Sequence, residues 1–254
     1  MEYDDAPLCR RVNGCDLLQL RTQSRVLPVA AIKEAMEGKV SDYRNRMAQE
    51  PPRSELRRLR EETKEELLPK ALLRSERTLA CFIPQESLLA VNVGTDAKAD
   101  WFIDQLRTCF GEFVCVPLTF NQSPGELLKR IFLGETPAGF ALGRECRMQD
   151  VSDAKSIASW RGFELSDPSI RRHVAEGMNL THLGVEFEQI MSCVISQDGV
   201  ISKFKFAEGD AVDTPDTEDP IARMDADFVL LAGTVQRLVA TLKKLLGGYA
   251  TAND

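Results

Sequence analysis

The sequence has few of the residues that build metal and nucleophile sites. Among its 254 residues are two histidines, His173 and His182, nine positions apart, which indicates surface or structural roles rather than a shared metal ion. Its seven cysteines include no C-x-x-C pair, so neither a disulfide framework nor a zinc site is expected. We interpret most of the cysteines as small, buried apolar residues.

The common catalytic motifs are also missing. The sequence contains no phosphate loop of the form G-x-x-x-x-G-K-[ST], no G-x-G-x-x-G after a strand, no G-x-S-x-G elbow and no H-E-x-x-H. We therefore expect no catalytic residues, no metal and no cofactor. Asp225 and Asp227 leave an enzyme as a third alternative, because two carboxylates can share a magnesium ion. We favour one of them as the N-cap of the last helix, and the acidic stretch 208–219 as a solvated loop.

Long apolar runs are absent as well. No run approaches the roughly 18 residues that span a bilayer, and residues 1–15 form no apolar signal segment. A composition with 43% hydrophobic and 28% charged residues is typical of a soluble globular protein with one large or two modest cores. The sequence predicts a cytoplasmic protein with no membrane partner.

What the chain does have is an uneven distribution of positive charge. The net charge is −7, yet twelve of the 32 basic residues fall between Val29 and Arg77. A protein this acidic can bind a polyanion only through local basic patches. DNA is therefore the first partner to test.

The first half of the chain predicts a helical hairpin. Residues 1–27 offer one expected strand, 15–20, with no hairpin to anchor it. From Pro28 onward, apolar residues recur at spacings of three and four, which predicts a helix that ends before Pro51-Pro52. A second helix follows from about Arg53 to Leu67.

The remainder predicts an α+β fold with mixed or antiparallel sheets, into which the helical hairpin is inserted. Apolar runs at 79–84 and 88–93, a helix over 99–110 and a strand at 113–118 form an expected β-β-α-β unit. The later expected elements are a helix after Ser123, strands at 139–147 and 159–165, a helix at 168–176, one long strand at 183–196, an Asp198-Gly199 turn into a strand at 200–206, and a last helix over 228–245.

Basic residues recur on separate elements of this fold. On the second helix the cations have acidic neighbours, so for that helix alone a solubilising surface is the favoured interpretation. Lys203 and Lys205 are expected to share one face of a strand, with Phe204 and Phe206 on the other. No recognition helix and no row of aromatic residues is evident, so binding is expected to use phosphates without sequence preference. The candidate DNA contacts are Arg25, Lys33, Lys70, Arg74, Arg161, Lys203 and Lys205.

Four strings, in consistent order, resemble the bacterial recombination-associated protein RdgC family. They are VLPVAAIKEAMEGKV from Val26, LLPKALLRSE from Leu67, DGVISKFKF from Asp198 and RMDADFVLL from Arg223, the last followed by Gly247-Gly248. The resemblance runs from about Val12 to Tyr249. It implies a non-enzymatic nucleoid protein that dimerises into a ring around duplex DNA, without sequence preference, and that restrains RecA-promoted recombination. Single-stranded DNA is a second candidate ligand.

The resemblance also implies a domain organisation. Residues 1–27 would be a remnant of a central domain, 28–78 a helical tip, 79–121 the central β-β-α-β domain and 122–254 a C-terminal α+β base. Tips and bases would pair on opposite sides of the ring, with Leu72 in the tip interface.

Three departures from the family pattern stand out. Members usually begin with about sixty further residues, which Met1–Arg11 do not match, so the central sheet is expected to be incomplete. Leu72 replaces an aromatic residue beside the basic Lys70, which predicts a weaker gate between tips. Gly162 and Phe163 follow a single arginine where consecutive basic residues are usual, which predicts lower DNA affinity.

A protein-interaction module is the main alternative. In this hypothesis the charged helical hairpin binds a recombination or replication partner, for instance a recombinase, and DNA binding is incidental.

Overall fold

The structure is a computed structural model that describes residues 9–153, 155–207 and 219–250. It confirms the α+β class, with two antiparallel sheets. The chain divides into two compact units, one comprising residues 1–9 and 18–80 and the other residues 10–17 and 81–254. The boundary falls within two strands, β2 (Cys15–Val26) and β3 (Leu72–Ile83).

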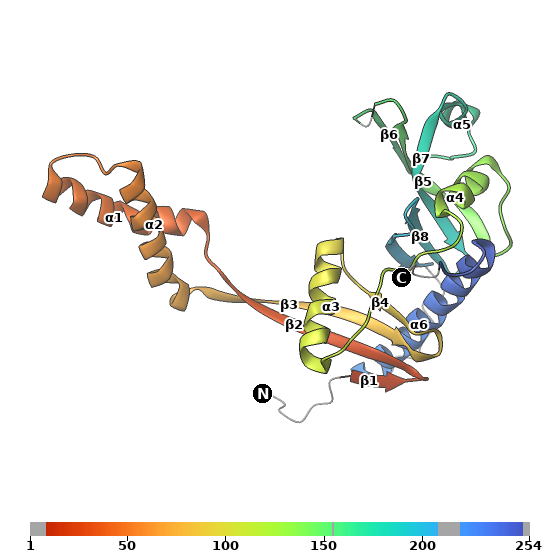
Figure 1. Cartoon of the computed structure of the whole chain (residues 1–254), viewed down its shortest axis with the longest axis horizontal. Coiled ribbons are helices and arrows are strands. Elements are labelled where there is room, and N and C mark those ends of the chain that lie inside the picture. Colours follow the sequence, from red (N-terminus) through yellow and green to blue (C-terminus); the bar gives the residue numbers. More distant parts are fainter. Residues whose placement is uncertain (1–8, 154, 208–218, 251–254) are drawn as a thin grey trace. The chain divides into compact units, whose positions relative to one another are not determined.

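The first unit contains the expected helical hairpin. Helix α1 spans Val29–Met47 and α2 spans Arg53–Leu67, followed by the short 3-10 helix η1 at Leu68–Lys70. Figure 1 shows the two helices side by side. Pro28 and Pro52 precede them, where a missing N–H costs no helical hydrogen bond. Few of their side chains are buried, chiefly Ile32, Leu59 and Thr63, so the hairpin has only a thin core of its own.

The start of the chain is better ordered than the sequence analysis expected. Strand β1 (Cys9–Val12) precedes β2, and the first sheet has the order β1-β2-β3-β4. Asn13 and Gly14 join β1 to β2 with φ values of 48° and 79°. Asn-Gly is the preferred pair for a two-residue hairpin, because both positions tolerate positive φ. The expectation that no hairpin anchors residues 15–20 was therefore wrong.

In the second unit, the short turn after β3 leads into β4. A 3-10 turn, η2 (Pro84–Glu86), joins β3 to β4 (Leu88–Val91), and α3 (Asp96–Phe110) follows with Thr95 as its N-cap. The strand expected at 113–118 is wrong, because no ladder of hydrogen bonds forms there among the described residues. Val114 and Val116 alternate like strand residues but are 91% and 67% exposed.

The second sheet has five strands in the order β6-β5-β7-β8-β9. Their bounds are β5 Phe140–Asp150, β6 Ile157–Arg161, β7 Met178–Phe187, β8 Met191–Ser196 and β9 Ile201–Phe206. The single long strand expected at 183–196 was wrong: Glu188 and Gln189, with φ of 52° and 57°, turn the chain between β7 and β8. Neither residue type signals such a turn. The strand expected to reach 165 ends at Arg161, because Gly162 adopts a φ of 77°.

Three helices complete this unit and cover one face of the sheet. Helices α4 (Pro124–Leu133) and α5 (Pro168–Ala175) contribute to the larger hydrophobic core together with β5, β7 and β8. Helix α6 (Pro220–Leu245) contributes Leu238 and Leu242 to that core, and Phe228 and Ala232 to a smaller cluster with Cys81 and Ile83. One helix therefore packs against both sheets.

The cap of α6 differs from the expectation. The Asp219 carboxylate accepts a hydrogen bond from the Ile221 backbone N–H at 2.9 Å, and α6 begins at Pro220. Asp225 and Asp227 lie inside the helix, so neither is its N-cap. The rest of the acidic loop, residues 208–218, lies outside the described residues.

The cysteines divide between core and surface. Cys81, Cys146 and Cys193 are buried, as expected, and burial raises the pKa of the Cys193 thiol to about 12. Cys9 and Cys109 are exposed, so the expectation of burial holds for only some of the cysteines.

Within the described part of the chain, no helix combines the length and apolar character needed to cross a bilayer.

Candidate nucleic-acid interface

The five-stranded sheet has one covered face and one that we call the open face. Alternate residues of a strand point to opposite sides. Along β7, Leu183, Val185 and Phe187 enter the larger core, so His182 and Glu186 lie on the opposite, open face. The same alternation sends one side chain in two along the neighbouring strands to the open face.

Basic residues from three strands meet on the open face. They line two adjoining hollows of about 200 and about 280 Å³, which share Glu145, Val194 and Lys203. The acidic residues that line the hollows are Glu145 and Glu186. The basic residues are Arg144 and Arg147 of β5, Arg161 of β6, and Lys203 and Lys205 of β9. With five cations to two carboxylates, this surface has the opposite charge balance to the whole chain.

Two glycines allow β5 and β7 to approach closely in the middle of the open face. A Cβ added at Gly143 would lie 2.7 Å from the backbone carbonyl of Gly184, and one added at Gly184 would lie 3.1 Å from the Glu145 carbonyl oxygen. The pairing of β5 with β7 shifts register between Leu142 and Cys146, which is the mark of a bulge. The two strands therefore approach each other closely at this point, where neither position leaves room for a Cβ.

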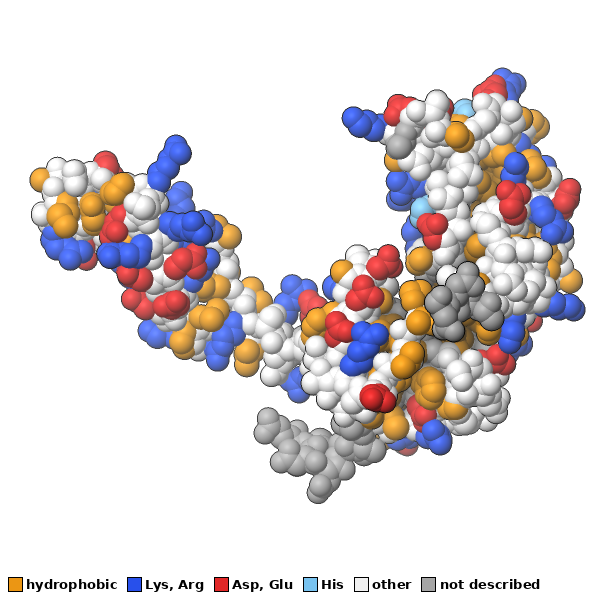
Figure 2. All heavy atoms as spheres, in the orientation of Figure 1, with side chains coloured by type: hydrophobic (Ala, Val, Ile, Leu, Met, Phe, Trp, Pro, Cys, Tyr) orange, Lys and Arg blue, Asp and Glu red, His pale blue; other side chains and the backbone are white. Residues whose placement is uncertain are grey.

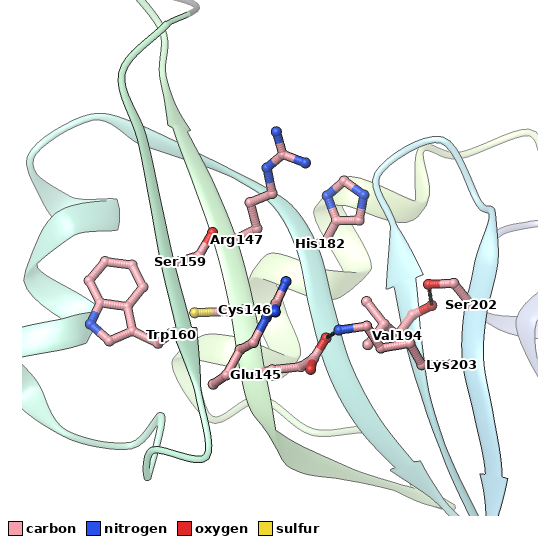
Figure 3. Close-up of a pocket in the computed structure, with 10 residues that line it drawn as sticks. Glu145, Cys146, Arg147, Ser159, Trp160, His182, Val194, Ser202 and Lys203 are labelled. Atoms are coloured by element: carbon pink, nitrogen blue, oxygen red, sulfur yellow. Dashed lines mark hydrogen bonds and ion pairs between the residues drawn. The ribbon is translucent and has the colours of Figure 1, made fainter. Parts of the chain in front are cut away.

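Lys203 is held by a bulge in β9. Its φ is 53°, and the pairing of β8 with β9 shifts register between Ser192 and Val194. Its ammonium group donates to the Glu145 carboxylate (Figure 3), so β9 is tied to β5 across the open face. Arg161 lies directly opposite Glu145 in the pairing of β5 with β6. Among the described residues, no carboxylate lies within 4.0 Å of the Arg161 guanidinium.

The two faces of β9 carry the side chains that the sequence predicted. Phe204 and Phe206 pack against the larger core with ring centroids 5.3 Å apart, whereas Lys205 is exposed. Lys205 has no ion-pair partner in the part of the chain that the structure describes. The aromatic residues therefore anchor the strand that presents the two lysines.

His182 lies among these cations. Figure 3 shows it on the strand next to Arg147. Partial burial, followed by the nearby charge of Arg147, lowers the pKa of the His182 imidazole. Its Nδ1 atom lies 3.1 Å from the Thr181 hydroxyl. His182 is therefore mostly neutral at pH 7, and protonation adds a further positive charge to the open face.

The other four predicted DNA contacts belong to the first unit. Arg25 donates from Nη1 to the carbonyl oxygens of Leu68 at 3.0 Å and Pro69 at 2.6 Å, so it stabilises the end of the hairpin. Arg74 pairs with Glu76 at 2.9 Å. Lys33 and Lys70 are exposed and, among the described residues, have no carboxylate within 4.0 Å. The contact of these residues with DNA stays a prediction.

Leu72, the predicted interface residue, is strongly exposed. It is 82% exposed and its neighbour Leu73 is 58% exposed. An apolar pair at the surface fits a contact with another molecule, and a dimer through this residue stays a prediction.

One carboxylate of the alternative pair, Asp225, is engaged elsewhere. Both oxygens of Asp225 accept hydrogen bonds from Arg10, each at 2.6 Å. This bidentate pair lowers the pKa of the Asp225 carboxyl group. Asp225 therefore joins β1 to α6.

Arg144 and Arg147 were not predicted from the sequence. Neither belongs to a basic run, and their strand reads as an ordinary half-buried one. Only the order of the strands brings β5 beside β6 and β7, and periodicity does not reveal that order. Spacing did provide one signal, because Glu145 and Arg147 are two residues apart and share a face.

Comparison with known proteins shows what the chain is similar to. The model of the family described as "RdgC: Putative exonuclease, RdgC" matches residues 1–249. The match starts at residue 1 and so includes Met1–Arg11, which the sequence analysis had left unmatched. Recombination-associated protein RdgC of Tolumonas auensis is 31% identical over 245 residues, which cover 95% of this chain and 81% of that protein. The protein of the same name from Sodalis glossinidius is 30% identical over 247 residues, covering 96% and 81%. The chain therefore belongs to the RdgC family of recombination-associated proteins.

Proposed function

We propose that this protein binds duplex DNA without sequence preference, through contacts between its cations and the phosphate backbone, and that the open face is a principal contact surface. The observation that supports this proposal is the charge of that face: five basic side chains from three strands, against two carboxylates, in a chain of net charge −7. Such a local excess attracts a polyanion even when the whole molecule repels it.

The character of these side chains favours phosphate over base recognition. The described residues that line the hollows of the open face come from strands and their adjoining loops, so no recognition helix is offered there to a major groove. Arginine binds phosphate through a planar fork, and lysine binds it as a point charge. Affinity should therefore be similar for unrelated sequences.

We further propose that the protein acts as a non-enzymatic homodimer that closes around DNA in the nucleoid and opposes RecA. The support is membership of a family of recombination-associated proteins, together with the exposed Leu72. A closed ring is retained on DNA by its topology, so moderate phosphate contacts are sufficient. Light scattering should give twice the chain mass, and Leu72→Glu should shift the protein toward the monomer.

Nuclease activity is the specific alternative, because the matching family description names an exonuclease. End-labelled DNA should stay intact with the protein and Mg²⁺. Degradation that disappears in Asp227→Asn, while the fold is kept, would contradict the non-enzymatic proposal.

A salt titration tests the binding proposal. Fluorescence anisotropy with two unrelated 30-base-pair duplexes, between about 50 and 200 mM salt, should give matching affinities. The slope of log affinity against log salt concentration should be about −4 from the open face alone, and steeper if other surfaces also contact DNA, since each phosphate contact contributes about −0.9. Arg161→Gln with Lys205→Gln should reduce the slope by about 2.

The control has the same change in charge on paired residues. Arg107→Gln with Arg130→Gln removes two exposed cations of the second unit that are bound to Asp104 and Glu135. Equal losses in both double variants would mean that net charge, not the open face, governs binding. If the affinity of the unmodified protein for DNA did not change with salt concentration, the binding proposal would be contradicted.

A further inference from the structure

We propose that one edge of α2, formed by Arg53, Arg57 and Arg60, is a second phosphate-binding surface that contacts the DNA backbone. This inference rests on the DNA binding proposed above, and it assigns a role to arginines that the sequence analysis left as a solubilising surface. We call this edge the arginine edge.

The helix separates its charges by position. With 3.6 residues per turn, Arg53, Arg57, Arg60 and Lys64 fall within an arc of about 60°. The residues that face α1, including Leu59 and Thr63, occupy a neighbouring arc. The acidic residues of α2 lie outside the basic arc: Glu55, Glu61, Glu62, Glu65 and Glu66. The hairpin thus has a basic edge although its total charge is balanced.

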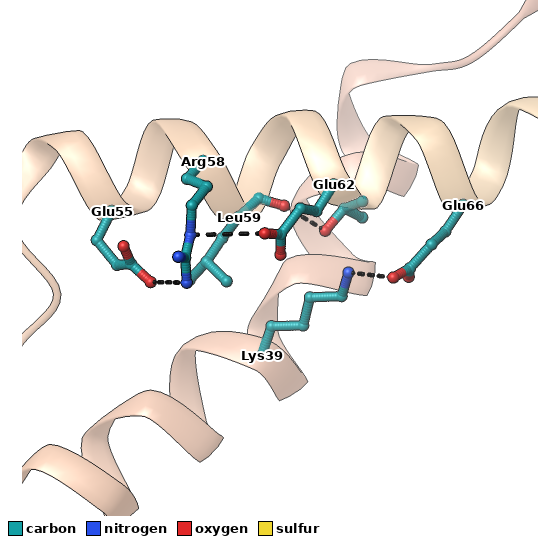
Figure 4. Close-up of polar contacts among 7 residues, drawn as sticks. Lys39, Glu55, Arg58, Leu59, Glu62 and Glu66 are labelled. Carbon is teal, nitrogen blue, oxygen red and sulfur yellow. Dashed lines mark hydrogen bonds and ion pairs between the residues drawn. The ribbon is translucent and has the colours of Figure 1, made fainter.

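Ion pairs distinguish the arginine edge from the rest of the hairpin. Arg58 lies between Glu55, at 2.6 Å, and Glu62, at 3.5 Å, and Lys39 binds Glu66 at 2.8 Å (Figure 4). Those cations are already neutralised by carboxylates of the same hairpin.

The arginine edge lacks such partners. In the described part of the chain, no carboxylate lies within 4.0 Å of Arg53, Arg57 or Arg60, and all three are exposed. Lys64, at the end of the same arc, pairs with Glu61 at 2.8 Å. The charge of Glu61 acts on Arg57 and Arg60 over a longer range, but neither arginine gives up an ion pair within 4.0 Å when it binds a phosphate.

The spacing fits a phosphate chain. From Arg53 to Arg60 the helix rises about 10 Å, and one DNA strand carries a phosphate every 3.4 Å or so of its axis. Three guanidinium groups along this edge can therefore each reach a different phosphate. Because these contacts do not involve base edges, they add affinity without sequence preference.

Charge and composition favour DNA over an acidic protein. Stable protein interfaces use arginine together with buried apolar or aromatic anchors at their centre, and the basic arc of α2 carries no apolar residue. A surface of arginines alone matches a partner whose contact surface is a row of anions. An acidic protein partner is the alternative outcome of the test.

Adjacent arginines provide a matched experiment. Arg57→Gln and Arg58→Gln change the same residue type on the same helix, and glutamine has a helix propensity close to that of arginine. Duplex affinity measured by anisotropy should fall about fivefold at 0.15 M salt for Arg57→Gln. The slope of log affinity against log salt concentration should become shallower by about 0.9. Arg58→Gln should change little, because Glu55 and Glu62 already bind its guanidinium.

The triple variant Arg53→Gln/Arg57→Gln/Arg60→Gln should reduce the slope by about 2.7, with the helical circular dichroism unchanged. Unchanged affinity in the triple variant, with normal binding by the unmodified protein, would overturn this inference and leave the open-face proposal intact. Equal losses for Arg57→Gln and Arg58→Gln would overturn it too, as a general charge effect. Failure of the unmodified protein to bind duplex DNA would overturn both proposals. Loss of binding to an acidic protein alone would assign the arginine edge to that partner.

Discussion

The helical hairpin and the five-stranded sheet both carry exposed cations, but they assemble them differently. Between Val29 and Leu67 the hairpin has nine basic and nine acidic residues. Figure 2 shows blue and red side chains interspersed over this hairpin. On the open face, by contrast, five basic residues from three strands face two acidic ones. A helix brings together residues three and four apart, so several of its cations, such as Arg58 and Lys64, pair with local carboxylates, whereas a sheet joins residues that are distant in sequence.

The two regions also differ in how they are stabilised. The hairpin buries few side chains, such as Ile32 and Leu59, and its other contacts are largely surface ion pairs, each worth at most about 1 kcal/mol. The sheet unit has a large continuous core. The hairpin should therefore open locally more often than the sheet unit.

The largest expected effect comes from two glycine substitutions. Gly143→Ala places a Cβ 2.7 Å from the Gly184 backbone and should lower the free energy of unfolding by about 3 kcal/mol, the upper range for overpacking. Gly38→Ala, in α1 with nothing within 4 Å, should stabilise the hairpin by about 0.5–1 kcal/mol, because glycine is unfavourable within a helix. Amide hydrogen exchange locates each change: faster exchange in β5 and β7 for the first, slower exchange in α1 for the second. If both substitutions changed the free energy of unfolding in the same direction, the contrast between the hairpin and the sheet unit would be contradicted.

The sequence predicted the helices of the hairpin well, whereas α6 begins at Pro220 rather than at the expected 228. Apolar spacings of three and four, with prolines at the borders, located α1 and α2 almost to the residue. The Asp198-Gly199 turn between β8 and β9 was also predicted, because its residue types tolerate positive φ. These are local signals, and local signals are what a single sequence contains.

The failures concern pairing between distant segments. Residues 113–118 have the alternation of a strand, but a strand needs a hydrogen-bonded neighbour, and periodicity does not supply one. The turn at Glu188 and Gln189 was not predicted, because neither residue type is typical of positive φ. The open face was missed in part for the same reason, since Arg144 and Arg147 become part of it only through the order of the strands.

A smaller effect is expected from the Lys203–Glu145 ion pair, which tests whether a local carboxylate limits the open face. Glu145→Gln removes one of two carboxylates from the hollows and frees the Lys203 ammonium group. Duplex affinity should rise about fivefold, which corresponds to about 1 kcal/mol for an exposed charge interaction. Glu188→Gln is the control, because Glu188 pairs with Arg237 at 2.8 Å and does not line the hollows. Weaker binding by Glu145→Gln would mean that Glu145 positions Lys203 for the DNA.

The smallest effect is expected from pH. Burial and then Arg147 lower the pKa of His182, while Lys203 lowers it further and Asp198 and Glu145 raise it. A phosphate bound nearby favours the charged imidazolium, so the pKa of His182 is higher in the complex than in the free protein. Linkage then requires that binding strengthens as pH falls through this range. Between pH 7.5 and 5.5, duplex affinity should increase about two- to fivefold.

His182→Ala should remove most of that pH dependence, whereas His173→Ala should keep it, because His173 packs against Trp160 on the covered side of the sheet, with ring centroids 5.0 Å apart. Anisotropy titrations at constant ionic strength measure both variants. The hairpin provides the internal comparison, because it contains no histidine, so the arginine-edge variants should retain the same pH dependence as the unmodified protein. If His182→Ala keeps the dependence while the arginine-edge variants lose it, the titrating group does not lie on the open face, and DNA contact there depends on the lysines and arginines alone.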